Sequence, residues 1–253
     1  MYYGRGAGSL SAALTVLRGG MRDSAYTDGV REDFDRLAVL SEGSGWEYNS
    51  HYHPFLLRQL PQRLGEVLEV GCGTGEFTRL LAERCERVVA VDLSPRMIET
   101  ARARSKDHPN VEYLVADAAS WEFPSERFDC AASIATLHHL PLGPMLAKMR
   151  DALKPGGTLL LLDLYRARTA ADRLVSALAV PISKAIRLAS TGSLAERQAP
   201  ELQKAWEEHG KTDAYPTLAE VRRACETELQ GVALRRRLLW RYTVVWRKPL
   251  RVG

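Results

Sequence analysis

Short apolar runs alternate with amphipathic stretches through the middle of the chain. Apolar strands are predicted at residues 67–70, 87–92, 111–115, 128–133 and 158–162. Helices with one apolar face are predicted between them, at 76–84, from Pro95 to about Arg104 and from about Leu142 to Leu153. Uninterrupted apolar strands separated by helices are typical of a parallel sheet that is buried on both faces. The pattern therefore predicts an α/β fold.

The pattern changes after the fifth strand. Residues 165–216 contain no strand pattern and carry amphipathic helical stretches at about 169–189 and 194–209, which predicts a helical cap insertion. The apolar faces of this cap either line a substrate pocket or form a satellite core, and they include Leu174, Leu178, Ile182 and Ile186.

The chain closes with one more helix and two strands. Thr217 and Glu220 have the spacing of a capping box, which predicts a helix that ends near Leu229. Two β-like runs follow at about 232–236 and 239–247. In the second run aromatic and aliphatic residues alternate with Arg241, Thr243 and Arg247, which predicts one buried face and one solvated face.

Composition is ordinary for a globular protein, with 45% hydrophobic and 26% charged residues in 253. We expect an N-terminal arm at 1–45, loose or lid-forming, and one domain at 46–253. No stretch approaches the roughly 20 apolar residues that span a bilayer, and the run at 10–17 is too short for a secretory signal.

The four cysteines lack metal or disulfide spacing. We therefore expect a cytoplasmic protein without a metal site.

The net charge of +4 is modest but uneven, because residues 231–253 hold seven Lys or Arg and no Asp or Glu. Such a basic tail is either a nucleic-acid footprint or the solvated side of a strand. The second interpretation is favoured.

A glycine-rich turn follows the first strand in the run Glu69-Val70-Gly71-Cys72-Gly73-Thr74-Gly75. Glycine lets the backbone turn tightly and approach a ligand without a Cβ atom in the way. The third glycine comes one residue earlier than in the dinucleotide fingerprint, and the next residue is Glu76. A carboxylate at a helix entrance repels pyrophosphate, so we expect a ligand without phosphate here.

Acidic residues follow the next two strands. Asp92 comes seventeen residues after Gly75, where a carboxylate can accept hydrogen bonds from both hydroxyls of a ribose. Asp117, followed by Ala118, can accept from the amine of an adenine. A lone Asp after a strand is usually a turn former, but its place in this series favours a ligand role.

These motifs together resemble the class I S-adenosylmethionine-dependent methyltransferases, in particular the small-molecule group akin to quinone-biosynthesis and natural-product methyltransferases. The resemblance runs in order from VLEVGCGTG through VVAVDLSPRMI, VEYLVADA and FDCAASIATLHHL to LKPGGTLLLLD. It implies a Rossmann-like, seven-stranded, mostly parallel sheet with an antiparallel last strand and helices on both faces. It also implies S-adenosylmethionine as cofactor and S-adenosylhomocysteine as product.

The resemblance assigns parts of the cofactor to residues of this chain. The glycine turn would pass its methionine part, Glu69 would orient the amino-acid end, Asp92 would hold the ribose, and Leu93, Met97, Asp117 and Ala118 would contact adenine. Met97 is equally suited to ordinary helix packing. The full set of expected cofactor-binding residues is Glu69, Gly71, Cys72, Gly73, Gly75, Asp92, Leu93, Met97, Asp117, Ala118, Ile134, Tyr48 and Tyr52.

Two further clusters have more than one interpretation. Tyr48 and Tyr52 either reach the sulfonium or pack their segment on the sheet. His138 and His139 follow the fourth strand, where parallel sheets place their ligands, and are the expected catalytic residues. Either can take a proton from the methyl acceptor, while the alternative is a structural or substrate-orienting role.

The expected function is methyl transfer to an O, N or C atom of a small, largely hydrophobic metabolite. The expected partner is that acceptor. Assembly into a homodimer is left open, and nucleic acid is disfavoured as a partner. One rival is an RNA or protein methyltransferase that uses the basic tail, although ATLHHL replaces the N-P-P-Y type sequence of base-amine methylation. The other rival is a non-catalytic cofactor-binding protein.

Overall fold

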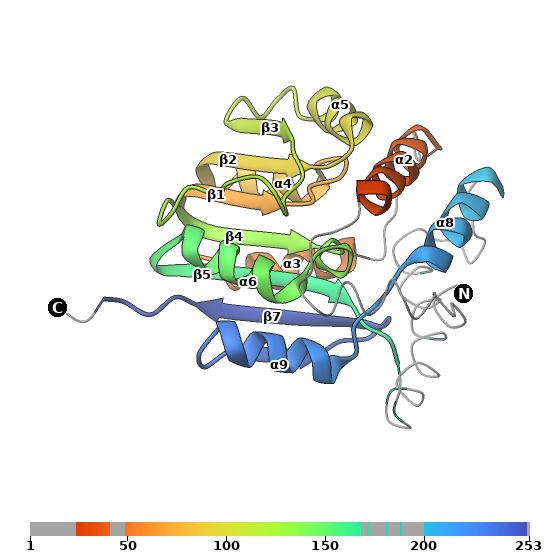
Figure 1. Ribbon diagram of the computed structural model, residues 1–253. Coiled ribbons are helices and arrows are strands. Elements are labelled where there is room, and N and C mark those ends of the chain that lie inside the picture. The colour runs from red at the N-terminus through yellow and green to blue at the C-terminus, as the bar shows by residue number, and fades with distance from the viewer. Residues whose placement is uncertain are drawn as a thin grey trace.

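One sheet organises the computed structural model, which describes residues 24–40, 49–167, 169, 172, 181, 188 and 200–251 (Figure 1). Within this part of the chain seven strands pair in the order β3-β2-β1-β4-β5-β7-β6. They are β1 (Leu64–Val70), β2 (Cys85–Asp92), β3 (Val111–Val115), β4 (Phe128–Ile134), β5 (Leu153–Leu164), β6 (Ala233–Arg236) and β7 (Arg241–Arg247).

The first five strands pair in parallel, and β7 is antiparallel to both of its neighbours. The expected Rossmann-like sheet with an antiparallel last strand is therefore confirmed.

Helices cover the sheet and its edge. The described helices are α2 (Ser24–Leu40), α3 (His53–Leu57), α4 (Glu76–Ala82), α5 (Pro95–Arg104), α6 (Leu142–Ala152), α8 (Pro200–Thr212) and α9 (Leu218–Glu228), with short 3-10 turns η1 (Ser50–Tyr52) and η2 (Leu137–His139). Among these described helices, none combines the length and apolar character that a bilayer crossing requires.

The predicted helix starts are confirmed at two caps. The Ser94 hydroxyl accepts the Met97 N–H at 3.0 Å, and Pro95 occupies the first position of α5, as expected. Thr217 and Glu220 form both hydrogen bonds of the capping box at the start of α9. These caps satisfy N–H groups that would otherwise lack partners in the first helical turn.

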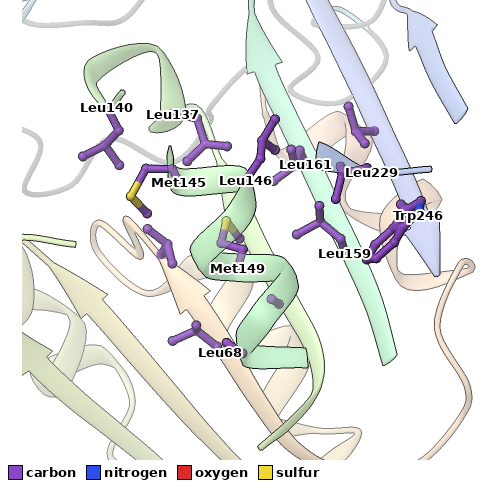
Figure 2. Packing of buried hydrophobic residues seen from close by; sticks show 14 of the residues in the cluster. Leu68, Leu137, Leu140, Met145, Leu146, Met149, Leu159, Leu161, Leu229 and Trp246 are labelled. Atoms are coloured by element: carbon purple, nitrogen blue, oxygen red, sulfur yellow. The ribbon is translucent and has the colours of Figure 1, made fainter. Parts of the chain in front are cut away.

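The hydrophobic core lies in two layers, one on each face of the sheet. On one face α6 places Met145, Leu146 and Met149 over Leu68 of β1 and over β5, with Trp246 of β7 beside them (Figure 2). On the other face side chains of α3, α4 and α5 form a second buried cluster with inward residues of the same strands. Burial on both faces explains why the strands of the sequence are continuous apolar runs.

The predicted solvated face of β7 is wrong. Arg241 and Thr243 are only 3% and 1% exposed, whereas Arg247 is exposed. The Arg241 guanidinium donates from Nε to Asn49 Oδ1 at 2.7 Å and from another nitrogen to the Leu239 carbonyl at 2.6 Å. Alternation along a strand shows which residues share a face, but it does not show whether another segment covers the polar face.

Two helices lie beyond the carboxyl ends of the parallel strands. Figure 1 shows α2 and α8 there, next to each other, at the arrowheads of β1, β2 and β4. The helix α8 falls within the stretch predicted as a cap and overlaps the helix expected at 194–209. The expected cap residues Leu174, Leu178, Ile182 and Ile186 lie outside the described residues.

The burial of Arg241 predicts a large difference between two arginines of the same strand. Arg241→Ala leaves the buried Leu239 carbonyl and the half-buried Asn49 side chain without their donor, so we expect a loss of about 3 kcal/mol in the free energy of unfolding. Arg247→Ala removes an exposed side chain and is expected to cost less than about 0.5 kcal/mol. Urea denaturation of both variants measures the two losses. Equal losses of stability would contradict the burial of Arg241 on a covered face of β7.

Candidate functional site

A pocket lies at the edge of the sheet where β1 to β4 end. It is lined by residues 69–74 at the end of β1, 91–93 at the end of β2, 116–118 after β3 and 134–136 at the end of β4. Because these strands are neighbours in the order β3-β2-β1-β4, residues 117 and 134 are three strand spacings apart, roughly 14 Å. The pocket therefore runs along the sheet edge, long enough for an extended ligand.

The three positions of the turn hold glycine for different physical reasons. All three adopt positive φ, at +74° for Gly71, +51° for Gly73 and +76° for Gly75. A Cβ on Gly71 would collide with Thr136, and one on Gly75 would collide with the Tyr113 hydroxyl, whereas one on Gly73 would meet no atom within 4 Å. Only Gly73 therefore offers bare backbone to open space, and Gly75 is not among the residues that line the pocket.

Asp92 connects the ends of β1 and β2. Its Oδ2 accepts the Gly73 N–H at 2.8 Å and its Oδ1 accepts the Ser94 N–H at 2.9 Å. Burial raises the pKa of Asp92 from its ordinary value, although these N–H donors act in the opposite direction. The carboxylate is thus fixed in orientation and lines the pocket.

Glu69 is a buried acid beneath the glycine turn, with an exposed fraction of 2%. Its Oε2 accepts the Thr78 hydroxyl at 2.5 Å. Burial raises the pKa of Glu69 to about 8, opposed by the Thr78 hydrogen bond and reinforced by the charge of Asp92. Glu69 therefore holds its proton at neutral pH in the unliganded protein.

The loop after β3 is held from outside by a residue that the sequence analysis does not identify. Lys148 of α6 donates from Nζ to the carbonyls of Ala118, Ala119 and Trp121 at 3.0, 3.1 and 2.6 Å. Within the loop, Asp117 Oδ1 accepts the Ala119 N–H at 2.9 Å. Nothing in the local pattern of α6 marks this lysine, because its partners come about 30 residues earlier in the chain.

The helices α2 and α8 form the outer wall of the pocket. Val30 and Phe34 of α2 and Trp206 of α8 line it. The helix α2 is fastened to the N-terminus of α5 by Asp35, whose Oδ1 accepts the Ser94 hydroxyl at 2.5 Å. These wall residues are also missing from the sequence analysis, since α2 precedes every recognisable motif.

Most of the expected cofactor-binding residues meet in this one pocket. The expected residues that line it are Glu69, Gly71, Cys72, Gly73, Asp92, Leu93, Met97, Asp117, Ala118 and Ile134, together with His139 from the catalytic pair. Met97 also packs against Leu37 and Leu202 of the two wall helices, so both of its expected roles have a structural counterpart.

Other expected residues lie elsewhere. Tyr52 is buried, donates its hydroxyl to the Leu238 carbonyl at 2.9 Å and does not line the pocket. Tyr48 lies outside the described residues. The neighbour His53 does line the pocket, with Nδ1 3.7 Å from Glu76 Oε1, and burial lowers the pKa of its imidazole against the opposing charge of Glu76.

The two expected catalytic histidines differ in position. His139 lines the pocket, whereas His138 does not. The Nδ1 of His138 is 2.6 Å from Asp163 Oδ1, and its backbone N–H donates to Asp163 Oδ2 at 2.9 Å. Burial acts to lower the pKa of His138, but the charge and hydrogen bond of Asp163 outweigh it, so the pKa is raised.

Comparison of the sequence with known families and proteins gives consistent matches. The profile of a family described as "Methyltransferase domain" matches residues 67–157. An uncharacterized methyltransferase of Mycobacterium tuberculosis is 31% identical over 209 residues, which cover 81% of this chain and 98% of that protein. A demethylmenaquinone methyltransferase of Tropheryma whipplei is 29% identical over 149 residues, 56% of this chain and 62% of that protein.

Solved structures share the fold. The protein DhpI in complex with S-adenosylhomocysteine (SAH) superposes with a TM-score of 0.63 at 20% identity, covering 91% of this chain and 100% of that one. At this level of identity the likeness concerns the fold alone.

The glycine turn predicts unequal costs for two matched substitutions. Gly75→Ala forces a Cβ against Tyr113 at positive φ, so we expect a loss of about 3 kcal/mol in the free energy of unfolding. Gly73→Ala meets no neighbour and is expected to lose about 1 kcal/mol from backbone strain alone. Denaturation measures both. Tyr113→Phe should recover part of the Gly75→Ala loss, and no recovery would mean that the hydroxyl does not cause the collision.

The buried acid predicts a pH dependence of stability. The pKa of Glu69 is raised in the folded state, so its contribution is fully present below the unfolded value near 4.5 and is lost as pH rises through about 8. Between pH 5 and 8.5 we expect the wild type to lose about 3 kcal/mol more stability than Glu69→Gln, which cannot ionise. Denaturation of both proteins at the two pH values measures the difference, and parallel curves would refute the assignment.

Proposed function

The chain belongs to the class I S-adenosylmethionine-dependent methyltransferases, and from that premise we propose that it methylates an O, N or C atom of a small, largely hydrophobic metabolite, with S-adenosylhomocysteine as the second product. One observation carries the proposal. A single pocket combines carboxylates and bare backbone at the ends of β1 to β3 with an apolar wall from α2 and α8.

The carboxylates favour a cofactor that carries positive charge and no phosphate. Apart from Glu69, whose raised pKa keeps it protonated at neutral pH, the acids Glu76, Asp92 and Asp117 outnumber the single arginine, Arg104, among the described residues that line the pocket. Opposite charges attract strongly in a partly desolvated pocket, whereas phosphate would be repelled. S-adenosylmethionine, with its sulfonium and ammonium groups, matches this charge.

Asp92 is suited to hold the ribose. Each of its oxygens accepts one backbone N–H, and a carboxylate has about four acceptor positions in all. The remaining positions can accept both ribose hydroxyls without loss of the bonds that orient the side chain. Leu93 and Met97 would then pack on the adenine, and Asp117 and Ala118 would form hydrogen bonds with its edge. The methionine part of the cofactor would lie beside Glu69 and Gly73.

The chemical step depends mainly on positioning. Displacement at a sulfonium turns a cationic leaving group into a neutral one, so no new negative charge on it needs stabilisation, and alignment supplies most of the rate. His139 borders the pocket and is the proposed group beside the acceptor. His138, held by Asp163 and outside the lining, is assigned the role of a positioning residue.

The apolar wall favours a hydrophobic acceptor. Phe34 and Trp206 line the pocket together with Ile134 and Leu140. Among the relatives, one is named for the methylation of demethylmenaquinone, which agrees with this choice. The cap at about 165–216 is proposed to set substrate specificity, because α8 belongs to it and already contributes Trp206.

The basic tail supports a small-molecule acceptor over nucleic acid. Five of its seven Lys or Arg residues have partners within the protein. Arg236 pairs with Asp172, Arg237 donates to Thr243, Arg241 donates to Asn49, and Lys248 and Arg251 both pair with Glu126. Basic side chains that bind partners within the protein are not arranged as a phosphate-binding surface.

The state of the cysteines is relevant to the cellular compartment of the protein. All four are free in the structure, at Cys72, Cys85, Cys130 and Cys225. Because disulfides form in oxidising compartments, free thiols are compatible with the proposed cytoplasmic location.

The cofactor assignment predicts a loss of affinity in one variant. Asp92→Asn should weaken binding of S-adenosylhomocysteine at least about 10-fold, because charge-assisted hydrogen bonds to the ribose are lost. Asp107→Asn, at an exposed aspartate, is the matched control and should bind like the wild type. Isothermal titration calorimetry measures both, with unfolding midpoints as a check on folding. Unchanged affinity in Asp92→Asn would remove Asp92 from the site.

The acceptor class is tested by a screen of phenolic and amine compounds with release of S-adenosylhomocysteine as the readout. Apolar aromatic acceptors are expected to give product. A parallel titration with RNA at low and high salt should show no specific binding, and methylated RNA as the only product would overturn the proposal.

A further inference from the structure

A cluster of histidine and carboxylate side chains lies against the pocket wall. His138 and His139 come from η2, His209 from α8, and Asp213 follows α8 directly. Each of these four side chains is at most 5% exposed. The Nδ1 of His139 and the Nε2 of His209 are each 3.5 Å from Asp213 Oδ1, and the Nε2 of His138 is 4.0 Å from Asp213 Oδ2.

The outer side of two of these imidazoles is fixed by a carboxylate. His138 Nδ1 is 2.6 Å from Asp163 Oδ1, and His209 Nδ1 is 3.1 Å from Asp33 Oδ2 of α2. These contacts leave the Nε2 atoms of both rings on the side of Asp213. A carboxylate on the far nitrogen is the usual way in which proteins orient a metal-binding histidine.

Asp213 is itself held in place. The Tyr215 hydroxyl donates to its Oδ2 at 2.5 Å, and the Tyr215 ring lies 4.9 Å from the ring of His138. The Asp213 carboxylate therefore keeps its Oδ1 directed to His139 and His209. Three of the four side chains, those of His138, His209 and Asp213, therefore have restrained orientations.

The spacing of these atoms is close to that of a coordination shell. Ligands at about 2.0–2.1 Å from a tetrahedral zinc ion lie roughly 3.4 Å apart. The two separations of 3.5 Å agree with this value, and one ligand atom each from His138, His139 and Asp213 all lie within 4.8 Å of one another. His209 is not one of these three residues and adjoins them through Asp213 Oδ1.

We propose that His138, His139 and Asp213, with His209 as a fourth ligand, bind a divalent transition-metal ion of the zinc class. Imidazole nitrogens with one carboxylate oxygen favour this class over calcium or magnesium, which prefer oxygen ligands alone. The ion would also compensate the buried carboxylates Asp163 and Asp213, which are only 1% and 3% exposed.

Such an ion would connect the cap to the sheet. Its ligands join η2, at the carboxyl end of β4, to α8, and Asp33 extends the connection to α2. His139 and Trp206, one from each side of this junction, both line the pocket. Metal binding would therefore fix the wall against which the acceptor lies.

The sequence analysis expects no metal site from the spacing of the cysteines, and the ligands proposed here share no recognisable spacing either. The pair His138 and His139 is separated by about 70 residues from His209 and Asp213. The only local signal is the His209-x-x-x-Asp213 spacing, which places two ligand types one helical turn apart. The proposal is independent of methyl transfer, since it concerns binding of the ion by the unliganded chain.

The test uses tag-free protein that has been dialysed against a chelator and titrated with Co²⁺ and Zn²⁺. We expect one ion per chain, a visible Co²⁺ absorption band of a low-symmetry site that Zn²⁺ abolishes, and a rise in the unfolding midpoint with Zn²⁺. Asp213→Asn and His139→Ala should each weaken Zn²⁺ binding more than 10-fold. Asp163→Asn, which acts only through His138, should weaken it 10- to 100-fold.

His51→Ala is the matched control, because this histidine is exposed and outside the cluster, and it should bind like the wild type. Circular dichroism checks that each variant is folded. Absence of stoichiometric Co²⁺ binding by the wild type overturns the proposal, whichever variants fold. Binding that survives in both Asp213→Asn and His139→Ala would also overturn it. Activity is not needed for any of these readouts.

Discussion

The hydrogen bond between the Asp92 carboxylate and the Gly73 N–H is the contact on which the architecture of the pocket depends. It joins the end of β2 to the turn after β1, while the other Asp92 oxygen binds the Ser94 N–H at the start of α5. Ser94 in turn accepts the Met97 N–H and donates to Asp35 of α2. One carboxylate therefore sets the glycine turn, the entry into a helix and, through that helix, the outer wall.

This arrangement explains how the edge of the sheet acquires a polar pocket. Parallel strands bring the residues at the ends of β1, β2 and β3 together, and Asp92 and Asp117 among them give the pocket an acidic lining. The bare backbone at Gly73 gives a ligand close access, whereas Gly71 and Gly75 are required by contacts with Thr136 and Tyr113. The same glycine motif thus leaves backbone open at one position and permits close packing at the other two.

The wall opposite the sheet edge is built from segments that are distant in sequence. Phe34 of α2 and Trp206 of α8 face the same pocket, and the contact between His209 and Asp33 ties their two helices together. The cluster around Asp213 adds a second junction, between α8 and the end of β4. The shape of the pocket wall and the position of α8 are therefore linked through the same side chains.

The sequence by itself determined the parallel sheet, the caps at Ser94 and Thr217, and the residues of the glycine turn and strand ends that line the pocket, and its resemblance to the methyltransferases implied the antiparallel last strand. It could do so because strand burial, glycine turns and helix caps are local, with the relevant residues adjacent or one turn apart. Tertiary structure alone decided that Arg241 is buried, that Tyr52 lies away from the pocket, and that Lys148 holds the loop after β3. It also decided that His209 and Asp213 meet the His138 pair. These outcomes depend on which distant segment covers a given side chain, and periodicity along one strand or helix carries no information about that cover.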